Sequence, residues 1–174
     1  LTKLHQPVVP PSPGRVMLRF VREAHNRLHW LIREEGEVEL GTTLTACWIA
    51  YGHVAWAHVG DSRLYLIRDG QAFQLSPDQT RNEFAQRDGK AAVSEGVNLA
   101  QSFIYGSRGL GDDSTIRLEY GMDASIERLH PGDHLLLCSD GFSGVVETHE
   151  MVKLVQDAPN AQKAASNCVD RAIN

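Results

Sequence analysis

The sequence predicts an α+β fold in which helices cover antiparallel sheets. A helical pattern comes first, at 16–34, and short strand-like segments joined by tight turns follow at 44–75 and 115–138. Two further helical patterns close the chain after position 147. Helices grouped apart from the strands are typical of α+β layers, whereas a doubly wound parallel sheet alternates strands with helices.

The size and charge of the chain indicate one ordinary globular domain. It has 174 residues, 42% of them hydrophobic and 22% charged, with a formal net charge of −5. This acidic balance argues against nucleic acid or an anionic membrane as a partner. No apolar run approaches the roughly 20 residues that span a bilayer. Three cysteines without C-x-x-C spacing fit a reduced compartment, so we expect a cytoplasmic protein.

The first segment, 1–15, is predicted to be a proline-rich arm or linker, because four prolines fall between positions 7 and 14. The domain itself is expected at 16–174. It opens with an amphipathic helix, in which apolar residues recur at three- and four-residue steps. These residues are Met17, Phe20, Val21, Ala24, Leu28 and Leu31.

The segment 44–75 is predicted to be a meander of about four short strands. The runs 44–50 and 54–59 flank a Tyr-Gly-His turn, and the second run is apolar enough to be buried on both faces. Further on, Asp69-Gly70 favours a type I′ hairpin turn, since both central residues of that turn need positive φ.

Residues 76–113 are polar and weakly periodic, and they are predicted to form a surface flap with one short helix near 81–86. Strands are expected again at 115–120, 125–129 and 134–138.

Two helices are expected to close the chain. Thr148 is placed to cap the first and Asn160 to cap the second. Both residue types accept hydrogen bonds from the free backbone N–H groups of a helix's first turn.

The first candidate for chemistry is Asp140, in the sequence Leu-Leu-Cys-Ser-Asp-Gly at 136–141. An aspartate at the end of an apolar strand, followed by glycine, places a carboxylate at a sheet edge where the backbone can turn sharply. Mg²⁺ and Mn²⁺ prefer oxygen ligands of this kind. Asp-Gly also begins many ordinary turns, so the tetrad alone leaves both interpretations open.

A second candidate is Asp61, in the Gly-Asp-Ser-Arg sequence at 60–63 between two predicted strands. Taken alone, this sequence is typical of a hairpin turn with a solvated tip. A third feature, Gly-Thr-Thr-Leu at 41–44, lies where a helix passes into a strand. Its threonines are equally suited to capping a helix or beginning a strand.

Five motifs taken in order resemble the bacterial type 2C protein phosphatases, which belong to the metal-dependent PPM family. They are Gly-Thr-Thr-Leu at 41–44, Gly-Asp-Ser-Arg at 60–63, Arg-Asp-Gly at 68–70, Leu-His-Pro-Gly-Asp at 129–133 and Leu-Leu-Cys-Ser-Asp-Gly-Phe at 136–142. The likeness extends over roughly 16–173, and motifs in a fixed order are more specific than any single one.

The resemblance implies an α-β-β-α sandwich of two antiparallel sheets flanked by helices, incomplete in this chain. It implies hydrolysis of phosphoserine or phosphothreonine in a protein substrate by a metal-activated water, in opposition to a Ser/Thr kinase. Two Mn²⁺ or Mg²⁺ ions are implied, with a third, weaker site. By position, Asp140 matches the core metal ligand and Asp61 the aspartate that helps hold the weaker ion. Ser62 and Arg63 are expected to be structural.

The sequence departs from the family pattern at both ends. The family opens with a phosphate-clamping arginine and the motifs Asn-Glu-Asp and Asp-Gly-Met-Gly-Gly, and it closes with Asp-Asn; none of these motifs occurs here. Two explanations stay open. We expect a partial chain, inactive on its own, of a longer phosphatase; the alternative is a pseudophosphatase that binds a partner or a phosphopeptide. If the chain stands alone, we expect dimerisation or a second polypeptide to cover its uncovered face.

Two further interpretations concern Thr42 and the histidines. The Gly-Thr-Thr-Leu motif also resembles N-terminal-threonine hydrolases, in which Thr42 is the nucleophile. That chemistry needs a lysine about thirty residues later, and the only lysine between Thr42 and Ser139 is Lys90. His53 and His58 are predicted to pack and hydrogen bond rather than bind zinc, because no cysteine or third histidine has ligand spacing.

Overall fold

The computed structural model describes residues 42–79, 119–121 and 128–174, together with individual helical positions between 16 and 30. One antiparallel sheet has the order β1-β2-β5 and the other the order β4-β3-β6. The strands are β1 (Leu44–Ala50), β2 (His53–Val59), β3 (Arg63–Arg68), β4 (Gln71–Gln74), β5 (Glu119–Gly121) and β6 (His134–Cys138). The helices after them are α3 (Asp140–Ser143), α4 (Thr148–Gln156) and α5 (Ala161–Ile173).

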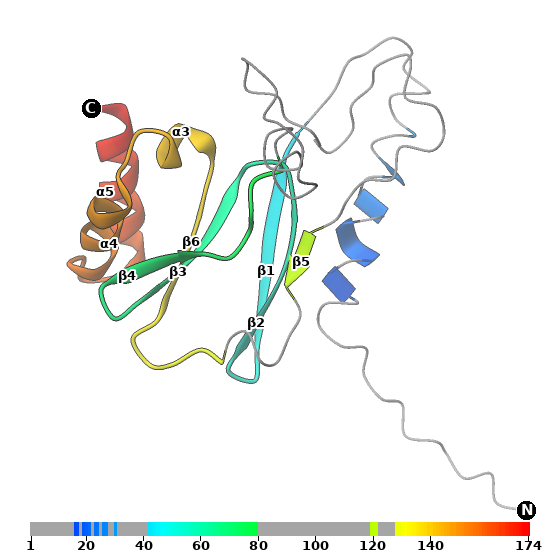
Figure 1. Cartoon of the computed structure of the whole chain (residues 1–174), viewed down its shortest axis with the longest axis horizontal. Helices are drawn as coiled ribbons and strands as arrows, with labels where there is room; N and C mark the ends of the chain where they lie inside the picture. Colours follow the sequence, from blue (N-terminus) through cyan, green and yellow to red (C-terminus); the bar gives the residue numbers. More distant parts are fainter. Residues whose placement is uncertain are drawn as a thin grey trace, which may run out of the picture.

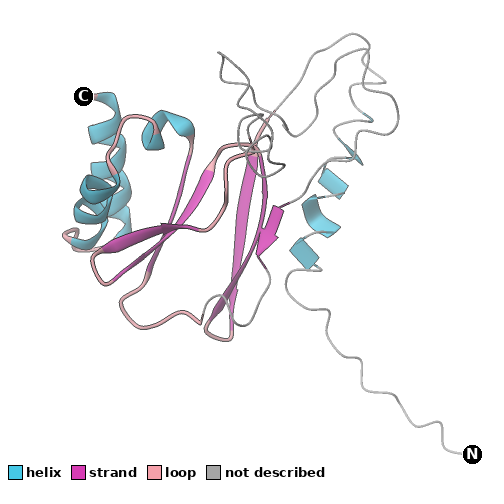
Figure 2. Ribbon diagram, in the orientation of Figure 1, coloured by secondary structure: helices cyan, strands magenta, loops and turns pink. Residues whose placement is uncertain are grey.

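These elements stack in four layers. The helical positions between 16 and 30 lie on one side of the sheet that contains β1, whereas α4 and α5 lie beyond the sheet that contains β3 (Figure 1). Figure 2 shows the two groups of strands between these helical layers. The predicted α-β-β-α sandwich of two antiparallel sheets flanked by helices is confirmed.

The predicted meander is divided between the two sheets. β1 and β2 pair in the first sheet, with Leu44 opposite Val59, whereas β3 pairs with β4 and β6 in the second. The chain therefore changes sheet at the turn between β2 and β3. The interior residues of β2 and β3 are buried, as expected for strands that are covered on both faces. A single meander with one face in solvent would instead expose alternate residues.

Each sheet has its own apolar core under its helices. On the first sheet, Met17 and Val21 pack on Ala57 and Val59 of β2. On the second sheet, Tyr65 and Ile67 of β3 pack against residues that follow β6. These residues are Phe142, Val146, Met151, Val152, Val155 and Cys168. The buried side chains at the alternate positions face the space between the sheets, because successive side chains of a strand point to opposite faces. They are Val54, Trp56 and His58 of β2 and Leu64 and Leu66 of β3.

The two closing helices are present, and their starts differ from the prediction in one respect. Asn160 caps α5, and its side chain accepts a hydrogen bond from the backbone N–H of Lys163, as predicted. The cap of α4 is Glu147, without a side-chain cap bond, so the prediction of Thr148 as the cap was wrong. The carbonyl of Glu147 already accepts from Glu150 and Met151, which makes Thr148 the first helical residue.

Several predictions fall on residues outside the described ranges. These are the arm at 1–15, the end of the first helix, most of the flap with its short helix near 81–86, and the segments 115–118 and 122–127. Of the two strands expected there, β5 occupies Glu119–Gly121, and Arg128 forms an isolated bridge with His53.

None of the helices in the described part of the chain is long and apolar enough to cross a membrane.

Candidate metal-binding site

Asp61 and Asp140 meet at one end of the second sheet. Asp61 lies in the turn between β2 and β3, two residues before Arg63, and Asp140 begins α3, two residues after Cys138. Arg63 and Cys138 are register partners in the antiparallel pair of β3 and β6. If the same register is continued for two residues, Asp61 lies opposite Asp140. Two residues that are 79 positions apart in the sequence are thus brought to the same end of the sheet.

The electrostatics of Asp61 agree with this placement. Its pKa is raised, first because the carboxyl group is partly buried and second because the negative charge of Asp140 lies near it. Asp140 is exposed, so the pair opens to solvent. Two carboxylates that repel each other at an accessible sheet edge are the type of oxygen donors that a hard divalent cation binds.

The described residues supply only part of a metal site. Within them, no group of three or more histidine, cysteine, aspartate or glutamate side chains is placed to hold a metal ion. Asp61 and Asp140 would supply two of the oxygen ligands of a divalent cation bound at this position, and water or further groups would have to complete the coordination.

The turn that carries Asp61 has a backbone shape that only glycine permits at its first residue. Gly60 is buried with a φ of +105°, in the left-handed region. A Cβ atom at Gly60 would lie 2.7 Å from the Cβ of Thr43, well inside van der Waals contact. Thr43 and Gly60 are thus in close contact, and this contact fixes where the turn leaves the first sheet.

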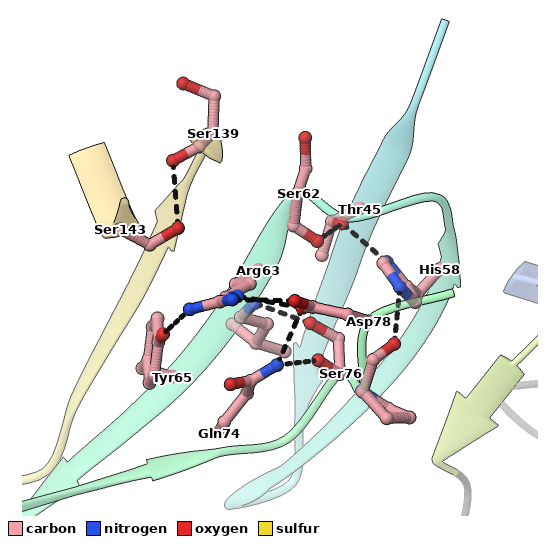
Figure 3. Close-up of polar contacts among 12 residues, drawn as sticks. Thr45, His58, Ser62, Arg63, Tyr65, Gln74, Ser76, Asp78, Ser139 and Ser143 are labelled. Carbon is pink, nitrogen blue, oxygen red and sulfur yellow. Dashed lines mark hydrogen bonds and ion pairs between the residues drawn. The ribbon is translucent and has the colours of Figure 1, made fainter. Parts of the chain in front are cut away.

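Hydroxyl groups join the same turn to the start of β1. The hydroxyls of Thr43 and Ser62 lie 2.7 Å apart, and the hydroxyl of Thr45 donates to the carbonyl oxygen of Ser62 at 2.6 Å. These contacts connect β1 and the residue before it with Ser62, directly after Asp61; Figure 3 shows the contact between Thr45 and Ser62. Thr43 directly precedes β1, which begins at Leu44. The neighbouring Thr42 is exposed, and its hydroxyl donates to the carbonyl of Thr43.

His58 is fully buried beside this turn. Its Nδ1 lies 2.9 Å from the hydroxyl oxygen of Thr45, and its Nε2 lies 2.9 Å from the carbonyl oxygen of Pro77. His53 places its Nδ1 2.9 Å from the carbonyl oxygen of Tyr51. The prediction that these two histidines pack and form hydrogen bonds is confirmed.

Arg63 makes its main contacts with side chains. Its Nε donates to Oδ1 of Asp78 at 2.8 Å and its Nη2 to Oδ2 at 2.6 Å, while Nη1 donates to the hydroxyl of Tyr65 at 3.0 Å. Figure 3 shows the guanidinium of Arg63 between Asp78 and Tyr65. This two-point pairing raises the pKa of Arg63 and keeps the side chain charged.

Residues 76–79 differ from the surface segment that their sequence predicts. Ser76 and Gln79 have no exposed surface. The hydroxyl of Ser76 accepts from the backbone N–H of Leu64 at 2.7 Å, and the side-chain oxygen of Gln79 accepts from the backbone N–H of Gly60 at 2.9 Å. Polar residues are buried here because they pair with backbone groups of the turn. Sequence reasoning missed them, since nothing in a polar segment marks which side chains find such partners.

Comparisons with known proteins identify the family to which the chain belongs. A family model described as protein phosphatase 2C matches residues 16–169. The chain is 30% identical over 155 residues to the serine/threonine protein phosphatase PstP of Mycobacterium tuberculosis, with 88% of this chain and 29% of PstP covered. It is 30% identical over 145 residues to the protein phosphatase PhpP of Streptococcus pneumoniae, with 83% of this chain and 57% of PhpP covered.

A solved structure shares the fold as well. The catalytic domain of PstP, crystallised in complex with two manganese ions, is similar with a TM-score of 0.65 and 27% identity over 86% of this chain and 60% of that one. The chain thus spans less than two thirds of the length of these relatives. With a family match over most of its length and the matching layered fold, this chain belongs to the protein phosphatase 2C family.

Proposed function

We propose that this chain is part of a metal-dependent protein serine/threonine phosphatase in which Asp61 and Asp140 are ligands of a divalent cation, Mn²⁺ or Mg²⁺. The observation that carries the proposal is that these two carboxylates lie at the same accessible end of the paired strands β3 and β6. They are close enough for the charge of Asp140 to raise the pKa of Asp61. Asp140 is the ligand of the central, two-ion part of the site. Asp61 helps it hold a further, weaker ion.

Family membership and the names of the relatives support this activity. PstP and PhpP are named as protein phosphatases, and the PstP catalytic domain was solved with two manganese ions. Bound divalent cations activate water as a nucleophile near neutral pH and neutralise charge on the transferring phosphoryl group. The residues of this chain hold the ions at a solvent-accessible position, which a phosphorylated protein substrate can reach. The partners are then a phosphoserine or phosphothreonine protein and an opposing Ser/Thr kinase in the cytoplasm.

The test is Mn²⁺-dependent hydrolysis of a phosphothreonine peptide by the full-length protein. We expect Asp140→Asn to lower kcat/KM by about 100-fold or more, because a ligand charge is lost from the ions that activate the water. Asp157→Asn is the matched control, since Asp157 is an exposed aspartate at the end of α4. Equal activity in both variants contradicts the assignment of Asp140. A full-length protein without Mn²⁺-dependent hydrolysis supports the pseudophosphatase instead.

A further inference from the structure

The segment directly after β4 contacts residues on both sides of Asp61: the backbone of Gly60 before it and the side chain of Arg63 after it. On the upstream side, Gln79 pairs with Gly60 twice: its side-chain oxygen accepts from the Gly60 N–H at 2.9 Å, and its own backbone N–H donates to the Gly60 carbonyl at 2.9 Å. Gln79 is fully buried. Gly60, the residue before Asp61, is therefore held through both its backbone N–H and its carbonyl oxygen in an interior position.

On the downstream side, Asp78 holds Arg63 through a two-point pairing of planar groups, with distances of 2.8 and 2.6 Å. About a quarter of the Arg63 side chain and less than a fifth of the Asp78 side chain are exposed. Asp78 also accepts from the side-chain amide of Gln74 at 3.0 Å, which ties it to β4 (Figure 3). Arg63 is in turn the register partner of Cys138, two residues from Asp140.

We propose that Asp78 and Gln79 are positioning residues for the Asp61 carboxylate: Gln79 fixes the residue before it, and Asp78, through Arg63, fixes the start of β3 after it. This inference rests on the proposed function, because it concerns the cation held by Asp61 and Asp140. Neither residue touches the carboxylates in the contacts described, so their effect is on where Asp61 points. Residues that orient metal ligands change metal affinity without binding the metal.

The other end of β3 provides a matched control. Arg68, the last residue of the strand, pairs with Asp133 with the same geometry, Nε to Oδ1 at 2.9 Å and Nη2 to Oδ2 at 2.7 Å. Arg63 and Arg68 thus make equivalent two-point ion pairs at opposite ends of one six-residue strand. Only the first of them adjoins Asp61.

The experiment compares Arg63→Lys with Arg68→Lys in the full-length protein. Both substitutions keep the positive charge and lose the planar two-point pairing. A substitution of Asp78 itself is less informative, because its negative charge lies near Asp61 and its removal would alter cation attraction by charge alone. The probe is Mn²⁺ alone, followed by water proton relaxation, and thermal unfolding of each variant reports its stability. Asp61→Asn and Asp140→Asn define the binding that belongs to the proposed site.

We expect Arg63→Lys to weaken the Mn²⁺ binding that Asp61→Asn removes by about 10-fold, the lower end of the loss found for outer-shell partners of metal ligands. Arg68→Lys is expected to lower the melting temperature similarly and to bind Mn²⁺ like the unmodified protein. The inference is overturned if Asp61→Asn weakens binding but Arg63→Lys does not, or if Arg68→Lys weakens it equally. If neither Asp61→Asn nor Asp140→Asn changes Mn²⁺ binding, the proposed metal site fails and the inference fails with it.

Discussion

Gly60 illustrates how one residue without a side chain determines where a functional carboxylate lies. Its φ of +105° turns the chain from β2 towards β3, and the side chain of Thr43 fills the space that a Cβ atom would need. The turn is then closed by the pairing of Gly60 with Gln79. Asp61 follows directly, so its position depends on a glycine for steric reasons.

At this scale we predict that Gly60→Ala destabilises the domain by about 2–4 kcal/mol, because backbone strain and a steric overlap add. Gly132→Ala is the matched control: Gly132 has a similar φ of +95°, but a Cβ atom there meets nothing within 4 Å. It should therefore lose only about 1 kcal/mol. Urea unfolding of both variants measures the difference, and equal losses would show that the contact with Thr43 does not matter.

Among the elements, α4 and α5 show that two similar helix starts are stabilised differently. Asn160 lies outside α5, and its side chain satisfies a backbone N–H of the first turn. Thr148 is the first residue of α4, and the cap before it, Glu147, makes no side-chain cap bond. A sequence pattern locates a helix start only to within one or two residues. An error of one residue is enough to mistake the first helical residue for the cap.

For these two helices we expect Asn160→Ala to lower the free energy of unfolding by about 1 kcal/mol, the usual effect of losing a side-chain cap. Thr148→Ala should change it by a few tenths of a kcal/mol at most, because no cap bond is lost and alanine is the better helix former. Chemical denaturation of the two single variants measures this. A larger loss for Thr148→Ala would mean that Thr148, and not Glu147, supports the start of α4.

In the molecule as a whole, ion pairs join segments that lie far apart in the chain. Asp133, in the turn before β6, pairs with Arg68 at the end of β3, 65 positions earlier. The Asp133 side chain is buried, and it also accepts from the backbone N–H of His130 at 2.7 Å. The pairing with Arg68 is the main cause that lowers the pKa of Asp133 to about 2.

This pKa predicts a pH dependence of stability. The folded-state pKa of Asp133 is depressed, so the stabilisation is fully present above the unfolded pKa of about 4 and is lost as pH falls from there through about 2. We expect Asp133→Asn to lower the free energy of unfolding by about 1 kcal/mol at pH 7, a discounted figure because Arg68 keeps contact with solvent. Unfolding curves of the two proteins measured from pH 7 to pH 2 should converge at the acid end. A constant difference at every pH would rule out this ion pair as the cause.

Sequence reasoning singled out Asp140 and Asp61 as candidate ligands through the resemblance carried by the ordered motifs, since each local sequence alone is also typical of a turn. It also located the cap at Asn160 and the strand at 44–50 from local patterns. It did not locate the change of sheet after β2, the burial of Ser76, or the contacts of Asp78 and Gln79. Those features depend on partners 12 to 21 positions away, and a polar side chain has the same appearance in sequence whether it is solvated or buried.

The sequence alone therefore determined the order of helices and strands, which follows from residue type and short-range spacing, and it determined the family resemblance, which in turn implied the two candidate ligands. Only the tertiary structure decided that Asp61 and Asp140 lie at the same end of the paired strands. It also decided that residues 76–79 hydrogen bond to the turn and to the start of β3. Packing between layers sets the register of β3 against β6. It also sets where the chain passes from the first sheet to the second, at Gly60, and no local pattern encodes either feature.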